Sequence, residues 1–337
     1  MLDGFFDVEN RLENLSKQGD PLEVLNRVVP WDIFRETLDQ VRIKERKSKA
    51  GRKPFDVILM FKILILQSMY NLSDDAVEYQ ICDRLSFMRF LNLSLGARVP
   101  DAKTVWLFRE QLGKAQLVQP LFEQFDTYLR VNGFAAQKGQ IVDASLVQTP
   151  KQRNSREENK QIKSDEEPEG WSAQKARQKD VDARWTKKNS KTYYGYKNHI
   201  QVDAKHKFIR DCAVTNAAVH DSQVFEQLLD EYNSSRDVWA DSAYQSKASV
   251  EKLEDKNFRP KIQRKGKRGK ALTPREIKGN TTRSRTRSRV EHIFGAQLVR
   301  AGNLLLRSIG LERAKINITL RNLSYNMGRL GTLTRAT

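Results

Sequence analysis

The spacing of apolar residues changes character near residue 140. Before that point, apolar positions recur every three to four residues, which is the period of an amphipathic helix. A helix beginning after Pro54 is apolar on nearly all sides, which predicts burial in a domain core. Ser73 and Pro100-Asp101 are typical starts for two further helices. Short helices joined by tight turns fit a helix-turn-helix DNA-binding module and a plain helical domain equally well.

The second half of the chain predicts a mixture of strands and helices. Residues 116–136 are expected to hold a connecting helix, and residues 149–192 are polar, lack periodicity and are expected to form a long loop or disordered insertion. The expected strands are 141–147, the hairpin 194–203 and 208–215, then 238–240 and 260–263. Helices are expected after the cap at Asp221-Ser222, and at 247–256, 284–301 and in the C-terminal segment. We therefore expect an all-helical domain at 1–115 and an α/β domain at 137–337.

The charge balance adds a class of partner to this picture. Sixty Lys and Arg against forty-two Asp and Glu give a formal net charge of +18. Thirteen basic residues and a single acid, Glu276, fall between Arg259 and Arg289, and a second basic cluster spans Arg42 to Lys53. Such runs attract phosphate backbones, although one run by itself also fits a solvated loop.

The cysteines and the apolar segments exclude several classes. Only Cys82 and Cys212 are present, so a disulfide framework or a structural zinc site is not expected. The N-terminus has no signal-peptide pattern, and the most apolar segment, 57–70, is short for a membrane span and contains Lys62. We expect a cytoplasmic protein that does not associate with membranes.

Three carboxylates far apart in the sequence stand in settings that suggest metal chemistry. Asp143 and Asp241 each lie in a short apolar strand, and Glu291 lies on a helix with arginines around it. Three carboxylates can hold a pair of Mg²⁺ ions, because Mg²⁺ prefers oxygen ligands and retains several waters. Each acid alone fits an ordinary cap or turn residue, so the signal is the order strand-Asp, strand-Asp, helix-Glu.

From about Lys53 onward the chain resembles the DDE transposases of bacterial insertion sequences, in particular the IS-five group. The motifs that carry the resemblance in the N-terminal part are Gly51-Arg-Lys-Pro54, Asn71-Leu-Ser-Asp-Asp75, Phe87-Met-Arg-Phe-Leu91 and Pro100-Asp-Ala-Lys-Thr104 with Phe108-Arg109. In the catalytic part they are Val142-Asp-Ala144, Asp182-Ala-Arg-Trp-Thr186, Tyr196-Lys-Asn-His199, His220-Asp221, Ala240-Asp-Ser-Ala-Tyr244 and Arg287-Ser-Arg-Val-Glu291.

This resemblance implies an α/β fold, an RNase H-like mixed sheet flanked by helices, with an all-α N-terminal domain for DNA binding. It implies that Asp143, Asp241 and Glu291 are catalytic and bind two Mg²⁺ ions, for which Mn²⁺ can substitute. The implied partners are double-stranded DNA, both as terminal inverted repeats and as target, and a second copy of the chain in a homodimer on DNA. The implied location is the prokaryotic cytoplasm, in association with the nucleoid.

Six basic side chains are candidates for contacts with DNA. They are Arg287, Lys197, His199, Arg300, Lys103 and Arg109. Related transposases carry a Tyr, Arg, Glu, Lys signature around the last acid, and this chain departs from it with Ser284 and Leu298 at the Tyr and Lys positions. Arg300 is a candidate to replace the missing lysine.

Three other functions compete with a transposase. One is a catalytically silent, sequence-specific DNA-binding protein derived from a transposase. A second is a general nucleic-acid-binding protein dominated by its basic segments, whose binding would depend steeply on salt and would not prefer particular ends. The third is a stand-alone RNase H-like nuclease, which would cut strands without joining them.

Overall fold

The computed structural model describes residues 6–42, 53–164, 166, 168–188, 190–266, 269 and 271–335. The chain forms two compact units. A helical unit contains Met1–Thr127, Arg300–Gly302 and Thr319–Thr337, and an α/β unit contains Tyr128–Val299 and Asn303–Ile318. Most of the basic cluster between Arg42 and Lys53 lies outside the described residues.

Capped helices make up the helical unit. Their bounds are α1 Asp7–Lys17, α2 Pro21–Val28, η1 Trp31–Phe34, α3 Arg35–Asp39, η2 Gln40–Arg42, α4 Val57–Tyr70, α5 Asp74–Asp83, α6 Leu85–Leu91 and α7 Ala102–Lys114. Parts of α8 (Val118–Val131) and α14 (Leu311–Arg335) complete it. Side chains of Asp56, Ser73 and Asp101 accept hydrogen bonds from backbone N–H groups in the first turns of α4, α5 and α7.

Helix α4 forms the centre of this unit, as its all-round apolarity predicts. Phe61 and Ile65 lie on one side of the helix and Ile63 on the opposite side, and all three are fully buried. Among the described residues no single helix is long and apolar enough to cross a membrane. Only α4 and α5 taken together meet the length and composition, and they are bent by 103° at the break between them.

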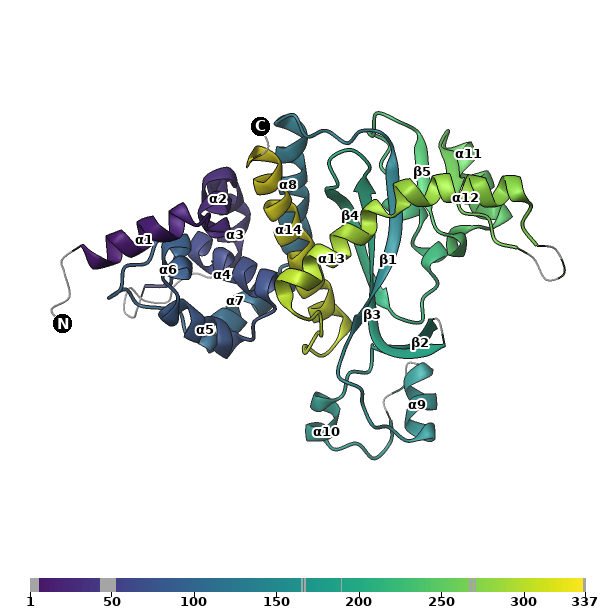
Figure 1. Ribbon diagram of the computed structural model, residues 1–337. Helices are drawn as coiled ribbons and strands as arrows, with labels where there is room; N and C mark the ends of the chain where they lie inside the picture. Colours follow the sequence, from purple (N-terminus) through teal and green to yellow (C-terminus); the bar gives the residue numbers. More distant parts are fainter. Residues whose placement is uncertain are drawn as a thin grey trace. The chain divides into compact units, whose positions relative to one another are not determined.

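A mixed six-stranded sheet forms the centre of the α/β unit (Figure 1). Its strands are β1 Gln140–Gln148, β2 Arg184–Lys188, β3 Lys191–Asp203, β4 Ile209–Asn216, β5 Asp237–Ala240 and β6 Arg259–Ile262. The order is β2-β3-β1-β5-β6, and β4 pairs with β3. Strands β1 and β3 are antiparallel, whereas β1, β5 and β6 are parallel. Helices α11 Lys247–Asp255, α12 Pro274–Arg287 and α13 Arg289–Ala301 accompany it. The expected α/β fold with helices flanking a mixed sheet, preceded by a helical region, is confirmed.

A close backbone approach fixes the start of β1 against β5. Gly139 has φ +83°, and a Cβ on it would lie 2.4 Å from the ring of Trp239 and 2.5 Å from the carbonyl oxygen of Asp237. The side chain of Asn233 accepts from Gly139 N and donates to Gly139 O, each at 2.9 Å. Only glycine therefore suits this position, because it tolerates both the left-handed backbone and the contact.

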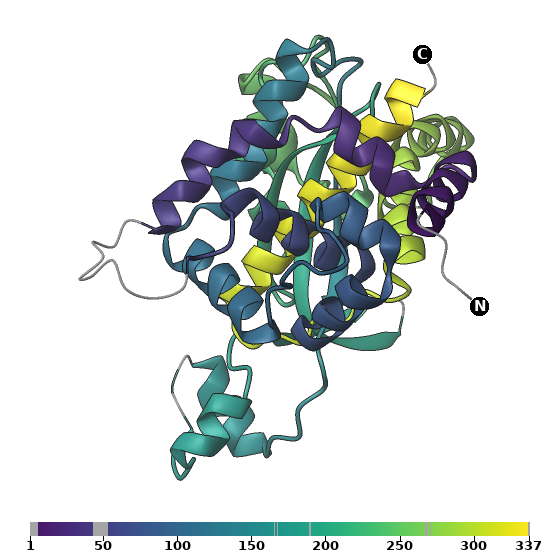
Figure 2. The same cartoon turned by 90° about the vertical axis from the view of Figure 1, so that its left-hand side faces the viewer.

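The described part of the polar insertion forms helices and the strand β2 where we expected a long loop or disorder. It contains α9 (Arg156–Lys163) and α10 (Ala173–Gln178), which lie beyond the end of the sheet in both views (Figure 1, Figure 2). Ser155 and Glu158 form a capping box at the start of α9. The indole of Trp171 donates to Glu158 at 2.6 Å, and this bond links the segment before α10 to α9. Local capping, rather than an apolar face, defines these helices, so a search for hydrophobic periodicity missed them.

Two expected helices also differ. The segment after residue 220 forms only the short 3₁₀ turns η3 (Asp221–Gln223) and η4 (Glu226–Leu228), and its N-cap is His220 rather than Asp221. The expected helix 284–301 is two helices, because α12 ends at Arg287 and α13 begins at Arg289.

Candidate active site

The pairing of β1 with β5 brings the first two predicted acids to matching positions. Gln140 pairs with Val238 and Ile141 pairs with Trp239, in parallel. Asp143 and Asp241 each lie two residues beyond the second of these pairs. Because parallel strands rise equally per residue, this register puts Asp143 within β1 level with Asp241, the residue that follows β5.

Asp143 is a largely buried acid, with 9% of its surface exposed. Its Oδ1 accepts from the backbone N–H of Ala144 at 2.8 Å, and its Oδ2 accepts from Nη1 of Arg287 at 2.7 Å. Burial, with a smaller contribution from the negative charge of Asp241, raises the pKa of the Asp143 carboxyl to about 6. The positive charge of Arg287 opposes this rise without cancelling it.

Arg287 joins the third acid to the first. Its Nη2 donates to Oε1 of Glu291 at 2.9 Å while its Nη1 binds Asp143. The break at Ser288 between α12 and α13 lies within this pair, and the N–H of Glu291 donates to the carbonyl of Ser288 at 3.1 Å. Glu291 is the exposed member, with 61% of its side chain accessible. One guanidinium therefore bridges a buried and an exposed carboxylate.

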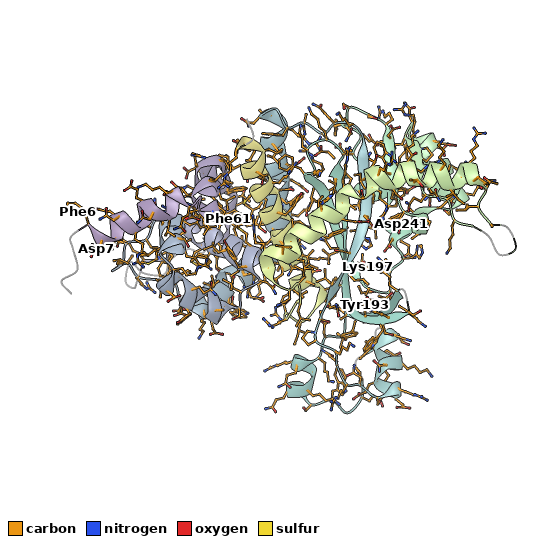
Figure 3. All side chains as sticks on the ribbon, in the orientation of Figure 1. Phe6, Asp7, Phe61, Tyr193, Lys197 and Asp241 are labelled. Carbon is orange, nitrogen blue, oxygen red and sulfur yellow. The ribbon has the colours of Figure 1, made fainter. Side chains whose placement is uncertain are left out.

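Asp241 begins the 3₁₀ turn η5 (Ser242–Tyr244), and its Oδ1 accepts from the N–H of Ala243 at 2.8 Å. Asp241 and Lys197, both labelled in Figure 3, come from the segments on either side of β1. The turn fixes the Asp241 side chain at the end of β5, where its negative charge contributes to the raised pKa of Asp143.

The donor set suits a hard divalent cation, although the three acids do not form a closed cluster. Among the described residues no group of three His, Cys, Asp or Glu side chains is placed to hold a metal ion. Arg287 bridges Asp143 and Glu291 within the site. Asp143 and Asp241 nevertheless offer carboxylate oxygens, and burial raises the pKa of Asp143 because it removes the negative charge from water. A divalent cation bound to these oxygens would stabilise that charge.

Two of the predicted DNA contacts on β3 have internal partners. Lys197 Nζ donates to the carbonyl of Val219 at 2.7 Å and to Oδ1 of Asp221 at 2.8 Å. His199 is fully buried, and its Nε2 lies 2.9 Å from the hydroxyl of Thr215. Burial lowers the pKa of His199 to about 4, so the imidazole is neutral near pH 7. In this conformation His199 has no exposed surface to offer a phosphate.

Three further predicted contacts, Arg109, Lys103 and Arg300, lie in the helical unit. Arg109 binds both carboxylate oxygens of Asp74 at 2.8 Å and Oε1 of Gln67 at 3.1 Å, so it ties α7 to α4 and α5. Lys103 is exposed on α7, and Arg300 is exposed beside Gly328 of α14. A contact between any of these side chains and DNA stays a prediction.

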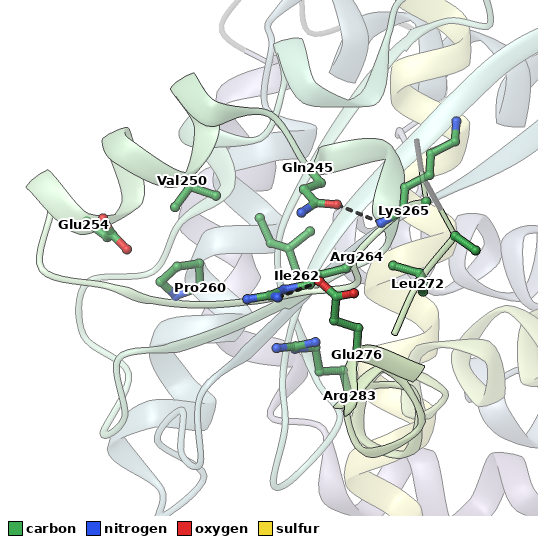
Figure 4. Close-up of a pocket in the computed structure, with 12 residues that line it drawn as sticks. Gln245, Val250, Glu254, Pro260, Ile262, Arg264, Lys265, Leu272, Glu276 and Arg283 are labelled. Atoms are coloured by element: carbon green, nitrogen blue, oxygen red, sulfur yellow. Dashed lines mark hydrogen bonds and ion pairs between the residues drawn. The ribbon is translucent and has the colours of Figure 1, made fainter. Parts of the chain in front are cut away.

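A concave site lies next to η5, the turn that follows Asp241. It is a pocket of about 570 Å³ between α11, β6 and α12, drawn in Figure 4. Arg264, Lys265 and Arg283 contribute positive charge to its wall. Arg264 is paired with Glu276 at 2.9 Å, and Lys265 N donates to the side chain of Gln245 at 2.9 Å. The sequence showed the basic run here but gave no sign that it lines a pocket.

Comparison with known proteins gives two family matches and one solved structure. Residues 135–327 match the model of a family described as "Transposase DDE domain", and this span includes all three predicted acids. Residues 10–111 match a family described as "Transposase domain (DUF772)". The cryo-EM structure of a piggyBac transposase synaptic complex with hairpin DNA is similar at a TM-score of 0.48 and 12% identity, over 94% of this chain and 76% of that one.

Proposed function

Because the chain belongs to the transposase DDE domain family, whose model matches residues 135–327 of its 337, we propose that it cuts DNA at the ends of an insertion sequence and joins those ends to target DNA. The observation that carries this proposal is the shared register of Asp143 and Asp241 on β1 and β5, with Arg287 linking Asp143 to Glu291. One carboxylate within β1, one just after β5, one exposed carboxylate on α13 and the guanidinium that bridges two of them are groups that phosphodiester chemistry can use.

Asp143, Asp241 and Glu291 would hold two Mg²⁺ ions, or Mn²⁺ in their place. When bound, such ions activate the attacking oxygen and neutralise the charge of the leaving oxygen. Arg287 would then release Asp143 and Glu291 and donate its forked N–H groups to a phosphate of the DNA. The protein residues would position the DNA strands and neutralise charge, and none of them would form a covalent bond to DNA.

The basic surface of α12 supports DNA as the substrate. Arg275, Lys278 and Arg285 are exposed on this helix, which ends at Arg287 in the acid site. A helix of positive charge leading to the acids would place phosphates along its length and direct the DNA backbone to the site.

The helical unit would recognise the terminal inverted repeats. On its α7, Trp106 and Leu107 are exposed beside Lys103, so this helix offers one basic and two apolar side chains for contact with a DNA groove. Two copies would act together on DNA.

A catalytically silent DNA-binding derivative is the second candidate. It is favoured by one observation, the Arg287 bridge, which occupies two of the three acids and leaves no three-acid group among the described residues. The two candidates differ in a single measurement, since only the active enzyme nicks end-bearing DNA when Mg²⁺ is added.

Our first prediction tests the role of Asp143. Replacing it with Asn removes the charge but keeps the shape, so Asp143→Asn should abolish Mg²⁺-dependent cleavage while binding to end-bearing DNA survives. Cleavage is followed on labelled duplexes and binding by gel shift. Asp237→Asn is the matched control, because Asp237 lies on β5 but pairs with Arg259. Retained cleavage in Asp143→Asn would remove this residue from the site, and a wild-type protein that binds without cutting would favour the silent derivative.

A further inference from the structure

Helix α12 is held in place without an apolar face. None of its fourteen residues, all of which the structure describes, is buried, and its one large aliphatic side chain, Ile277, is 53% exposed. Helices in folded proteins are mostly stabilised by burial of an apolar face, and their intrinsic helical preference contributes less. The position of Arg287, at the C-terminal end of α12, therefore depends on polar contacts.

Four polar side chains of α12 with internal partners lie along one face of the helix. They are Glu276, Asn280, Ser284 and Arg287, which follow one another at spacings of one helical turn. Oε1 of Glu276 accepts from Nη1 of Arg264 at 2.9 Å, a pair drawn in Figure 4. The side chain of Asn280 accepts from the backbone N–H of Arg264 at 2.9 Å and donates to its carbonyl at 2.8 Å. These contacts tie the first half of α12 to the segment after β6.

The contact made by Ser284 ties the last turn of α12 to the end of β5. Nε2 of Gln263 donates to the hydroxyl of Ser284 at 2.5 Å. The backbone N–H of the same glutamine donates to the carbonyl of Ala240, the last residue of β5, at 3.1 Å. Ser284 lies one turn before Arg287, and Ala240 directly precedes Asp241. A single glutamine thus connects the turn that carries Arg287 to the strand that leads into Asp241.

We propose that the hydrogen bond between Gln263 and Ser284 positions the last turn of α12, and with it Arg287, for strand cleavage. This inference rests on the proposed function. The contact of Arg287 with Asp143 is short, at 2.7 Å, and hydrogen bonds weaken steeply when their geometry is lost. A displacement of about 1 Å in a reacting group can slow a reaction about 100-fold. The alternative role for Ser284, which stands at the Tyr position of the family signature, is a direct contact with DNA.

The test removes the side-chain bond from either end. Ser284→Ala and Gln263→Ala both abolish it, whereas the backbone bond from residue 263 to Ala240 survives. Single-turnover cleavage of end-bearing DNA at saturating protein should slow about 10- to 100-fold in each variant, while DNA affinity stays unchanged. The double variant should be no slower than either single variant, because both changes remove the same bond. Ser284→Thr keeps the hydroxyl and should retain the wild-type rate.

Asn280→Ala is the matched control on the same helix. It removes both bonds to Arg264, so it should lower Tm at least as much as Ser284→Ala, and it should leave the cleavage rate unchanged because the last turn is still held. A cleavage rate that falls in step with Tm across all variants would make the Ser284 bond merely structural. Weaker DNA binding by Ser284→Ala would make Ser284 a DNA contact. Either result would overturn the inference.

Hydrogen exchange in the cation-free full chain separates this inference from the proposed function. Ser284→Ala should speed the exchange of backbone amides around Arg287 about tenfold, because the last turn loses its tie to β5, and Asn280→Ala should not. Unchanged exchange in Ser284→Ala would contradict the positioning role whether or not the protein cuts DNA. If exchange responds as expected but the wild type does not cut end-bearing DNA, the fault lies with the proposed function.

Discussion

Asp143 is a residue whose charge opposes folding and for which we propose a role in catalysis. Its carboxylate is charged near pH 7, largely buried, and compensated by one shared guanidinium. The pKa of about 6 lies above the ordinary 3.8, so the folded protein prefers the protonated acid. The stabilisation from that proton is complete below pH 4 and is lost as pH rises through 6. Above that range the buried negative charge of Asp143 is unfavourable, and a bound cation would stabilise it.

Asp143→Asn should therefore stabilise the cation-free protein at pH 8, because Asn imitates the neutral acid. A difference of roughly two pKa units corresponds to about 2–3 kcal/mol in the free energy of unfolding. Urea denaturation at several pH values would measure it, and the gain should vanish near pH 4. Glu291→Gln is the control, since its exposed ion pair should be worth less than about 1 kcal/mol. Destabilisation by Asp143→Asn at pH 8 would contradict this account.

The residues of the site were predictable from the sequence to different degrees. Asp143 and Asp241 stand out only through their order with Glu291, because each acid alone fits an ordinary cap or turn residue, and their matching register on β1 and β5 is compatible with the interpretation. Asp221 was expected only as a helix cap, and no local signal indicates its ion pair with Lys197. That pair depends on β3 and η3 meeting in space, which no local spacing reveals.

At the scale of elements, the start of β1 sets the geometry of the acid pair. Gly139 fits between the ring of Trp239 and the backbone of Asp237, and this contact fixes the position of β1 along β5. A slip of one residue would turn Asp143 to the other face of the sheet, away from Arg287. The sequence predicts both strands but contains no local signal for their relative position.

Gly139→Ala should accordingly be costly, by about 2 kcal/mol or more, because it adds a collision to an unfavourable backbone angle. Gly170→Ala is the matched control: Gly170 has φ +81° but nothing within 4 Å of its Cβ position. Thermal unfolding of both variants isolates the collision from the backbone penalty. Equal effects would show that the contact with Trp239 is not restrictive.

At the scale of the whole molecule, charge is the property that sequence alone establishes best. The net charge of +18 needs no coordinates, and the fold adds only where the positive side chains stand, as on α12. Domain boundaries were harder to foresee. The amphipathic pattern predicts the helix α14, but it cannot tell that residues 319–337 group with the helical unit rather than with the α/β unit. The predicted domains at 1–115 and 137–337 did not include that return.

If α12 contacts the DNA backbone, removing one of its charges should change the salt dependence of binding. Lys278→Ala should lower the slope of log affinity against log salt by about one, with similar loss for all DNA sequences. Fluorescence anisotropy over a salt series measures the slope. Lys247→Ala is the control, because this exposed lysine on α11 is already paired with Glu251 at 3.4 Å. An unchanged slope in Lys278→Ala would place the DNA elsewhere.

The return of residues 319–337 to the helical unit has a consequence for biosynthesis. Met1–Thr127 leaves the ribosome long before α14 does, since the whole α/β segment is translated in between. Until residues 319–337 are synthesised, the surface of the helical unit that they pack against stays exposed, while the strands of the sheet are being translated. We therefore expect the helical unit to complete its folding late, after all strands of the sheet have been synthesised.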